Sequence, residues 1–295
     1  MDLAFECALF VVGLAFGSFL NVCISRIPRD QSVVAPRSHC PACGAVLRWH
    51  DNIPLLSWAL LHRRCRDCGG RISLRYPIVE LLTAFLFTAC YLSFGPTIIA
   101  AKFCIFCFLL VGLIFMDAET GLLPREFTYP GIMLGLALSW IIPTDSTGTQ
   151  FLLRAFGVQL SPRPLALLDS VLGAFVGAGF FYLAWALYYL LRKRHGMGFG
   201  DIALMAVAGT FLGLKLTLLV IFAAPLAGSI YAILLLVRGT SGTAPMGGTS
   251  DGQAPPSTRE MLLTQELPFG VFLGACSLAT IFFGESIWRW YLGLF

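Results

Sequence analysis

Two aspartates next to long apolar runs are the residues of this sequence best placed for catalysis. Asp117 follows one such run, and Asp201 ends the stretch Gly-Met-Gly-Phe-Gly-Asp (196–201) directly before another. A carboxylate at the end of an apolar segment is costly and usually marks function. Two carboxylates that meet can act as base and acid, the base activating water for attack on a peptide carbonyl. The pair therefore predicts an aspartic peptidase.

Each aspartate also has a simpler interpretation. Asp201 fits a plain helix N-cap, and Asp117 fits a polar residue at a membrane interface. Gly198 and Gly200 would let the backbone approach an extended substrate, or they only make a loop flexible. If both aspartates are catalytic, the helix dipole favours an ionised Asp201 as base at a helix start and a protonated Asp117 as acid at a helix end.

Four cysteines form a second constellation with a metal-ligand spacing. Two Cys-x-x-Cys pairs, each followed by glycine, are separated by twenty-one residues and consist of Cys40, Cys43, Cys65 and Cys68. Two such turns supply four thiolates for a tetrahedral zinc ion. Structural disulfides or redox pairs are the alternatives, but a reducing cytoplasmic location disfavours stable disulfides. Because a four-sulfur site has no open position, we expect a structural zinc ion.

The elements that carry these residues are predicted to be membrane helices. Hydrophobic residues make up 57% of the chain and charged residues 12%, with a mean hydropathy of +0.80. A span needs about 20 apolar residues. The sequence predicts an all-α polytopic membrane protein with about eight transmembrane helices, at Leu3–Cys23, Ile78–Phe94, Thr97–Met116, Phe127–Ile142, Leu165–Leu191, Ile202–Leu214, Leu216–Val237 and Pro268–Trp290.

The distribution of basic residues predicts the orientation of these helices. The loop from Ser25 to Pro77 has nine arginines and three acids, which places it in the cytoplasm. Eight spans then put both termini in the periplasm, with fifteen basic residues inside and five outside. Asp117 and Asp201 both fall at the cytoplasmic face. Because most basic residues flank spans, the charge does not indicate nucleic-acid binding.

We expect three parts in this chain. Residues 1–24 form the first transmembrane helix, and residues 25–77 form a small cytoplasmic loop domain that binds zinc. Residues 78–295 form a seven-helix membrane peptidase domain embedded in the lipid bilayer. Within it, residues 239–266 are rich in Gly, Ser, Thr and Pro and are predicted to be a flexible cytoplasmic linker.

Taken in order, these motifs resemble a known family. They are Gly-Ser-Phe-Leu-Asn-Val (17–22), the two cysteine pairs, Asn-Ile-Pro-Leu-Leu-Ser-Trp (52–58), Arg-Tyr-Pro-Ile-Val-Glu (75–80), Asp117 before Leu-Pro (123–124), the 196–201 stretch and Leu-Pro-Phe-Gly (267–270). The chain resembles the type IV prepilin peptidases, the Gly-x-Gly-Asp membrane aspartic peptidases that act as leader peptidase/N-methyltransferases in type IV pilus and type II secretion systems.

The resemblance implies a bifunctional enzyme of the bacterial inner membrane. It would cut prepilin or pseudopilin leaders after a glycine at the cytoplasmic face, and then methylate the new N-terminal residue with S-adenosylmethionine. Asp117 and Asp201 match the family's catalytic aspartates. Methylation rests on the resemblance alone. Glu80 and Asn21, at the inner ends of the second and first spans, are candidates for that activity, or are polar anchors at helix ends.

Three positions depart from the family pattern, in which Asp commonly stands at Arg125, Lys at Ala203 and Pro at Val271. Two other classes of function compete with the enzyme. A transporter would use the paired carboxylates as a proton or ion pathway and would give the cysteine loop no role. A non-catalytic scaffold of the secretion apparatus would tolerate the loss of both aspartates.

Overall fold

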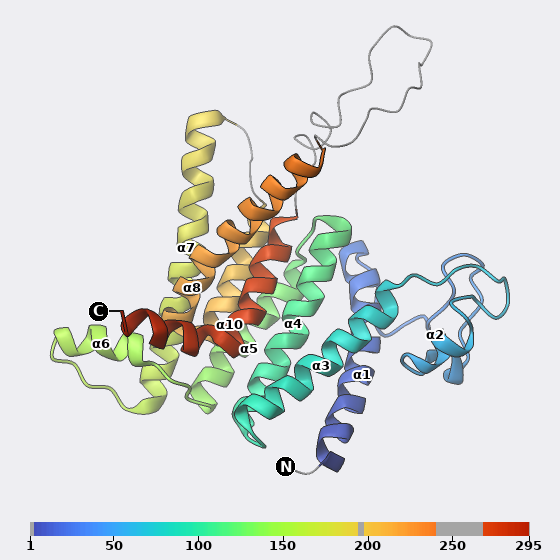
Figure 1. Ribbon diagram of the computed structural model, residues 1–295, viewed down its shortest axis with the longest axis horizontal. Helices are drawn as coiled ribbons and strands as arrows, with labels where there is room; N and C mark the ends of the chain where they lie inside the picture. The colour runs from blue at the N-terminus through green and yellow to red at the C-terminus, as the bar shows by residue number, and fades with distance from the viewer. Residues whose placement is uncertain (1–2, 194–197, 240–267, 295) are drawn as a thin grey trace, which may run out of the picture.

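In the computed structural model the chain is helical, and it is described for residues 3–193, 198–239 and 268–294 (Figure 1). Those residues contain no β-strand, only two isolated β-bridges, so the all-α prediction is confirmed. The elements are α1 (Leu3–Arg26), η1 (Ile27–Arg29), η2 (Trp49–Asn52), α2 (Leu56–Leu60), α3 (Arg75–Phe94), α4 (Ile98–Thr120), α5 (Arg125–Ile141), α6 (Thr147–Ala155), α7 (Pro162–Arg192), α8 (Phe199–Gly239) and α10 (Phe269–Leu292).

Six helices of the described chain are long and apolar enough to cross a membrane, namely α1, α3, α4, α7, α8 and α10. The chain is therefore a multi-pass membrane protein. The eight predicted segments agree with these helices once α5 is added and α8 is divided. With 17 residues and Pro130 inside, α5 is the short fourth segment. Nearly all of the predicted linker lies outside the described residues.

A backbone break at Gly213 divides α8. Gly213 has φ 72° and ψ 180°, which is not helical, and the break falls where the sixth predicted span ends. The freed N–H of Leu214 donates to the buried carboxylate of Asp169 at 3.2 Å. The hydroxyl of Thr149 in α6 donates to the same oxygen of Asp169 at 2.5 Å. Asp169 in α7 thus caps the second half of α8 and fixes where the first half, which carries Asp201, ends.

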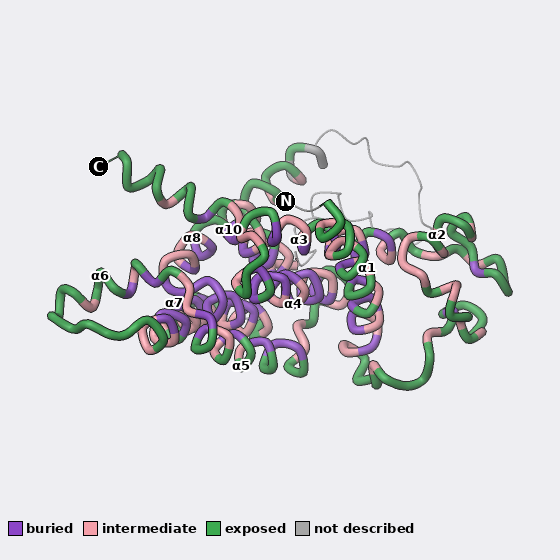
Figure 2. The backbone as a smooth tube through the Cα atoms, turned by 90° about the horizontal axis from the view of Figure 1, so that it is seen from below, coloured by how far each residue is buried: buried purple, intermediate pink, exposed green. Residues whose placement is uncertain are grey.

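The core lies around α4 and the first half of α8, and Figure 2 shows buried residues gathered around α4. Phe106 of α4 stacks on Phe211 of α8, with ring centroids 4.6 Å apart and planes 4° from parallel. The helices α7 and α8 approach through glycines. A Cβ atom on Gly209 would lie 2.3 Å from the backbone carbon of Gly173. Small residues at such crossings allow membrane helices to pack backbone to backbone.

We expect Gly209→Ala to destabilise the protein. The new methyl group would meet backbone atoms of α7, which cannot move aside as a side chain can, and overpacking of this kind costs about 1–3 kcal/mol or more. The thermal unfolding midpoint in detergent should fall by about 5 °C or more. Gly179→Ala in α7 is the matched control, because nothing lies within 4 Å of its Cβ position. Equal midpoints for the two variants would contradict the prediction.

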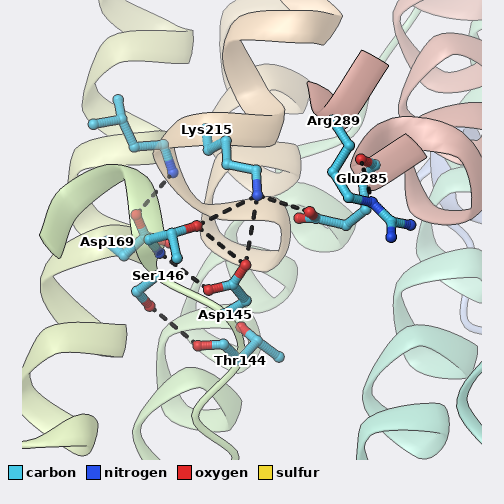
Figure 3. A network of polar contacts seen from close by, with 9 residues as sticks. Thr144, Asp145, Ser146, Asp169, Lys215, Glu285 and Arg289 are labelled. Atoms are coloured by element: carbon cyan, nitrogen blue, oxygen red, sulfur yellow. Dashed lines mark hydrogen bonds and ion pairs between the residues drawn. The ribbon is translucent and has the colours of Figure 1, made fainter. Parts of the chain in front are cut away.

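A polar network ties the bundle together at the end away from Asp117. Lys102 is fully buried in α4, and its ammonium donates to the hydroxyls of Ser139 at 3.1 Å and Thr144 at 3.4 Å. Beside it, the ammonium of Lys215 lies 2.8 Å from the carboxylate of Glu285 and 3.5 Å from that of Asp145 (Figure 3). These contacts join the segment before α6 to α4, α5, α8 and α10.

Candidate active site and metal centre

Asp117 and Asp201 are buried in helical turns at the same end of the bundle. Asp117 lies in the last turn of α4 and is 6% exposed, and Asp201 lies in the first turn of α8 and is 7% exposed. Gly121 ends α4 in the left-handed conformation, with φ 63°, and its N–H donates to the carbonyl of Asp117 at 2.8 Å. Gly200 packs closely on Leu123: a Cβ atom on Gly200 would lie 2.7 Å from the Cβ of Leu123.

The two carboxylates converge on the start of α10. A Cβ atom on Gly270 would lie 2.8 Å from Oδ2 of Asp117 and 3.3 Å from Oδ1 of Asp201, so these two oxygens are within about 6 Å of each other. The N–H of Val271, the third residue of α10, donates to Oδ2 of Asp117 at 3.1 Å. Residues from three distant parts of the chain thus form one acidic site.

The surroundings of this pair are acidic and apolar. Among the described residues neither aspartate forms an ion pair. Ala203, one turn into α8, offers no charge. The glycine stretch is described only from Gly198, whose carbonyl accepts the N–H of Asp201 at 3.3 Å. Gly196 and Met197 lie outside the described residues. Within the described part of the chain, no cation offsets the repulsion between these two carboxylates when both are ionised.

The four predicted cysteines meet in the loop module (residues 27–74), which stands at the ends of α1 and α3 beside the bundle (Figure 1). The sulfur atoms of Cys40, Cys43, Cys65 and Cys68 all lie within 4.8 Å of one another. A tetrahedral zinc ion with Zn–S bonds of about 2.3 Å holds its sulfurs about 3.8 Å apart, and the sulfurs of Cys40 and Cys68 lie 3.9 Å apart. The cluster is therefore compatible with structural zinc.

Both cysteine pairs sit on the same kind of turn. In the first turn the N–H of Cys40 donates to Ala45 and that of Gly44 donates back to Cys40, each at 2.9 Å. The second turn repeats this pattern, since the N–H of Cys65 donates to the carbonyl of Gly70 and that of Gly69 donates back to Cys65. Gly44 and Gly69 have φ values of 73° and 68°, which explains the glycine after each pair. The backbone N–H of Cys43 lowers the pKa of the Cys40 thiol to about 7, whereas the pKa of the neighbouring Cys43 thiol is raised to about 11.

Glu80 and Asn21, the candidates for methylation, lie next to each other where α1 crosses α3. Oε2 of Glu80 accepts the N–H of Leu55 at 2.8 Å, and Nδ2 of Asn21 donates to the carbonyl of Tyr76 at 3.0 Å. A Cβ atom on Gly17 would lie 2.6 Å from Cα of Glu80, so glycine is needed for this crossing. Both polar residues line a cavity of about 270 Å³ that extends into the cysteine module.

Comparisons with known proteins show the family of this chain. The family model for the bacterial peptidase A24 N-terminal domain matches residues 11–94, and that of the type IV leader peptidase family matches residues 104–233. A prepilin leader peptidase/N-methyltransferase of Myxococcus xanthus is 40% identical over 268 residues, which cover 88% of this chain and 73% of the relative. The chain belongs to the prepilin leader peptidase/N-methyltransferase family.

Two further relatives align with this chain over most of their own length. The prepilin leader peptidase/N-methyltransferase of Aeromonas hydrophila is 32% identical over 312 residues, covering 96% of this chain and 92% of the relative. A protein of Escherichia coli O78:H11 named "Type 4 prepilin-like proteins leader peptide-processing enzyme" is 37% identical over 256 residues, which cover 80% of this chain and 87% of the relative. No solved structure is significantly similar to the chain.

Membership in the leader peptidase/N-methyltransferase family confirms the predicted enzyme, and the transporter and scaffold alternatives find no support. The leader peptidase model covers both aspartates, and the N-terminal model covers the cysteine module with Glu80 and Asn21.

Gly270 and Val271 lie beyond both matches. In the sequence Gly270 stands only within the Leu-Pro-Phe-Gly motif, and a Pro-Phe-Gly stretch that begins a helix is the one signal of its close approach to the aspartates.

Proposed function

We propose that Asp117 and Asp201 are the catalytic pair of a membrane aspartic endopeptidase that removes the leader from prepilins or pseudopilins. Cleavage follows a glycine at the cytoplasmic face of the bacterial inner membrane. The observation that carries the proposal is the convergence of both carboxylates on Gly270. The names of the relatives support the substrate class, since each refers to a prepilin or prepilin-like leader.

In the proposed mechanism one carboxylate is ionised and the other is protonated. The ionised carboxylate takes a proton from water, which attacks the peptide carbonyl, while the protonated one donates its proton to the carbonyl oxygen. The carboxyl group that took the water proton then gives it to the leaving amine as the C–N bond breaks, and the other recovers its proton from a hydroxyl of the tetrahedral intermediate. The N–H of Val271 at the start of α10 stabilises negative charge on Asp117. We therefore assign Asp117 as the base and Asp201 as the acid. This assignment is the reverse of the one predicted from the helix dipoles, in which Asp201 at the start of α8 is the base and Asp117 at the end of α4 is the acid.

The proposed orientation places the cysteine module and the two aspartates in or at the cytoplasm and both termini in the periplasm. It rests on the basic residues of the loop between α1 and α3. In this arrangement residues 1–24 are the first membrane helix, residues 25–77 are the zinc-binding domain, and residues 78–295 are the peptidase domain. The same enzyme methylates the new N-terminus, using S-adenosylmethionine as methyl donor.

A cleavage assay tests the peptidase. Purified protein in detergent is incubated with a prepilin, and mass spectrometry follows the product that lacks the leader. We expect one cut, directly after a glycine. A proton- or ion-coupled transporter would show no cleavage in detergent, nor would a scaffold. Intact prepilin after prolonged incubation with folded wild-type protein would therefore refute the proposal.

We also expect about one zinc ion per purified chain, bound by Cys40, Cys43, Cys65 and Cys68. Cys43→Ser should remove one of the four thiolates and reduce the zinc content, measured by plasma mass spectrometry, to near zero. The thermal midpoint should fall as well, because the module has little core of its own. Cys7→Ser, which changes a cysteine far from the cluster, should leave both values as in the wild type. Full zinc content in the Cys43→Ser variant would contradict the assignment.

A further inference from the structure

The cavity between the cysteine module and the adjoining ends of α1 and α3 contains two buried charges without charged partners. Glu80 is 6% exposed, and Arg26, which also lines the cavity, is 7% exposed. The guanidinium of Arg26 donates only to backbone carbonyls, those of Ser32 at 3.0 Å and Arg37 at 3.4 Å. Within the described chain neither Glu80 nor Arg26 forms an ion pair. A ligand that carries both a cation and an anion would complement these charges.

Two neutral polar atoms of the same wall also lack partners. Oδ1 of Asn21 and Nε1 of Trp58 are buried and accept or donate no hydrogen bond among the described residues. Because Nδ2 of Asn21 is already engaged with Gly17 and Tyr76, its Oδ1 is oriented as a free acceptor. Buried polar atoms are normally paired. One free acceptor and one free donor therefore indicate a polar ligand with a complementary edge.

We propose that this cavity is the binding site of the methyl donor S-adenosylmethionine. Arg26 pairs with the carboxylate of its amino-acid part, Glu80 and the neighbouring Oδ1 of Asn21 accept from the ammonium group, and Nε1 of Trp58 donates to the adenine edge. The inference rests on the proposed function, since it gives the methylation step a place. When bound, the donor would supply a methyl group to the neutral amine of the new N-terminus: the N–CH3 bond forms as the S–CH3 bond breaks, the sulfonium becomes a thioether, and the methylated ammonium releases its proton to water.

The position of the cavity suits a product that comes from the aspartate pair. Tyr76 and Glu80 line the cavity from the first turns of α3. Arg75, at the start of the same helix, forms an ion pair with Glu119, two residues after Asp117 in α4. One ion pair between adjacent helices thus links the helix that lines the cavity to the helix that carries Asp117.

Isothermal titration of the full-length protein in detergent with S-adenosylhomocysteine tests the site. This probe has the same carboxylate, ammonium and adenine groups, and its binding needs no turnover. We expect Glu80→Gln and Arg26→Gln each to weaken binding at least tenfold, since each leaves the opposite ligand charge unpaired. Trp58→Phe, which keeps the ring and removes only the N–H, should weaken binding several-fold. Glu126→Gln, at an exposed carboxylate in α5, should bind as the wild type does.

Leader cleavage in the same samples separates the two proposals. A variant that still cleaves a prepilin is folded, so its weaker binding reports the cavity and not a general defect. Wild-type protein that cleaves but does not bind the probe would overturn the inference and leave the peptidase intact. Undiminished binding in Glu80→Gln, Arg26→Gln and Trp58→Phe together would also overturn it. Wild-type binding without cleavage would instead count against the peptidase alone.

Discussion

Asp117→Asn and Asp201→Asn are each expected to slow leader cleavage about a thousandfold or more. Asparagine has nearly the same shape as aspartate, and its amide oxygen can still accept the N–H of Val271. It can neither take a proton from water nor donate one to the leaving amine. The loss is therefore chemical, and it should be seen in single-turnover rates with saturating prepilin while the thermal midpoint changes little.

Asp169→Asn is the matched control, because Asp169 is also a buried aspartate in the bundle but lies at the Gly213 break. Asparagine there keeps an acceptor for the N–H of Leu214, so cleavage should stay within a few-fold of wild type. Cleavage by either active-site variant at a rate close to that of Asp169→Asn would disprove the catalytic pair. If Asp117 is the base, pH–rate profiles of residual activity should differ between the two active-site variants. Identical profiles would argue against any division of roles.

Gly270→Ala is expected to reduce cleavage at least a hundredfold, a loss similar to that caused by removing one catalytic hydrogen-bond donor. The new methyl carbon would lie 2.8 Å from Oδ2 of Asp117 and 3.3 Å from Oδ1 of Asp201. It would push apart the two groups that must act on one water molecule, and it would take part of the water's place. Small displacements of reacting groups have large effects on rate. The same single-turnover assay measures this loss.

Gly228→Ala provides the comparison for Gly270→Ala. Gly228 lies in the second half of α8, and the nearest atoms to its Cβ position belong to Phe269 and Phe272 of α10, at an ordinary 3.8 Å. Its substitution adds a methyl group near the same helix without touching a carboxylate, and cleavage should remain close to wild type. A Gly270→Ala variant as active as Gly228→Ala would show that the space beside Gly270 is not used in the reaction.

Much of the fold follows from the sequence because apolar length and charge are local properties. The run from Thr97 to Met116 predicted α4, and the loop rich in arginine marked where the module leaves the bundle. The division near Leu214 was also visible, although its cause was not. That cause is Asp169, a residue of α7 whose carboxylate replaces the missing helical partner of Leu214. The helix α6 was not predicted, since its nine residues are too few to show a clear period.

The candidate site could be predicted only where the sequence itself has a signature. The cysteine pairs and the aspartates with their flanking glycines have recognisable spacing, and the structure brings each set together. Val271 meets Asp117 through a backbone N–H across 154 positions of sequence, a contact that no spacing encodes. Arg26 looks like any other topology signal, because nothing in the sequence distinguishes a buried arginine from those exposed around it.

The valine after Gly270 has a consequence for inhibitors that mimic the transition state. Its N–H fixes the orientation of Asp117 before any substrate arrives, and groups aligned in advance need no reorganisation as charge develops. The proline that the resemblance leads one to expect at this position has no N–H and would leave the same oxygen without this donor. Statine-like hydroxyl compounds thus meet a pre-aligned carboxylate in this protein. Affinities measured on relatives with the proline should not be transferred to it.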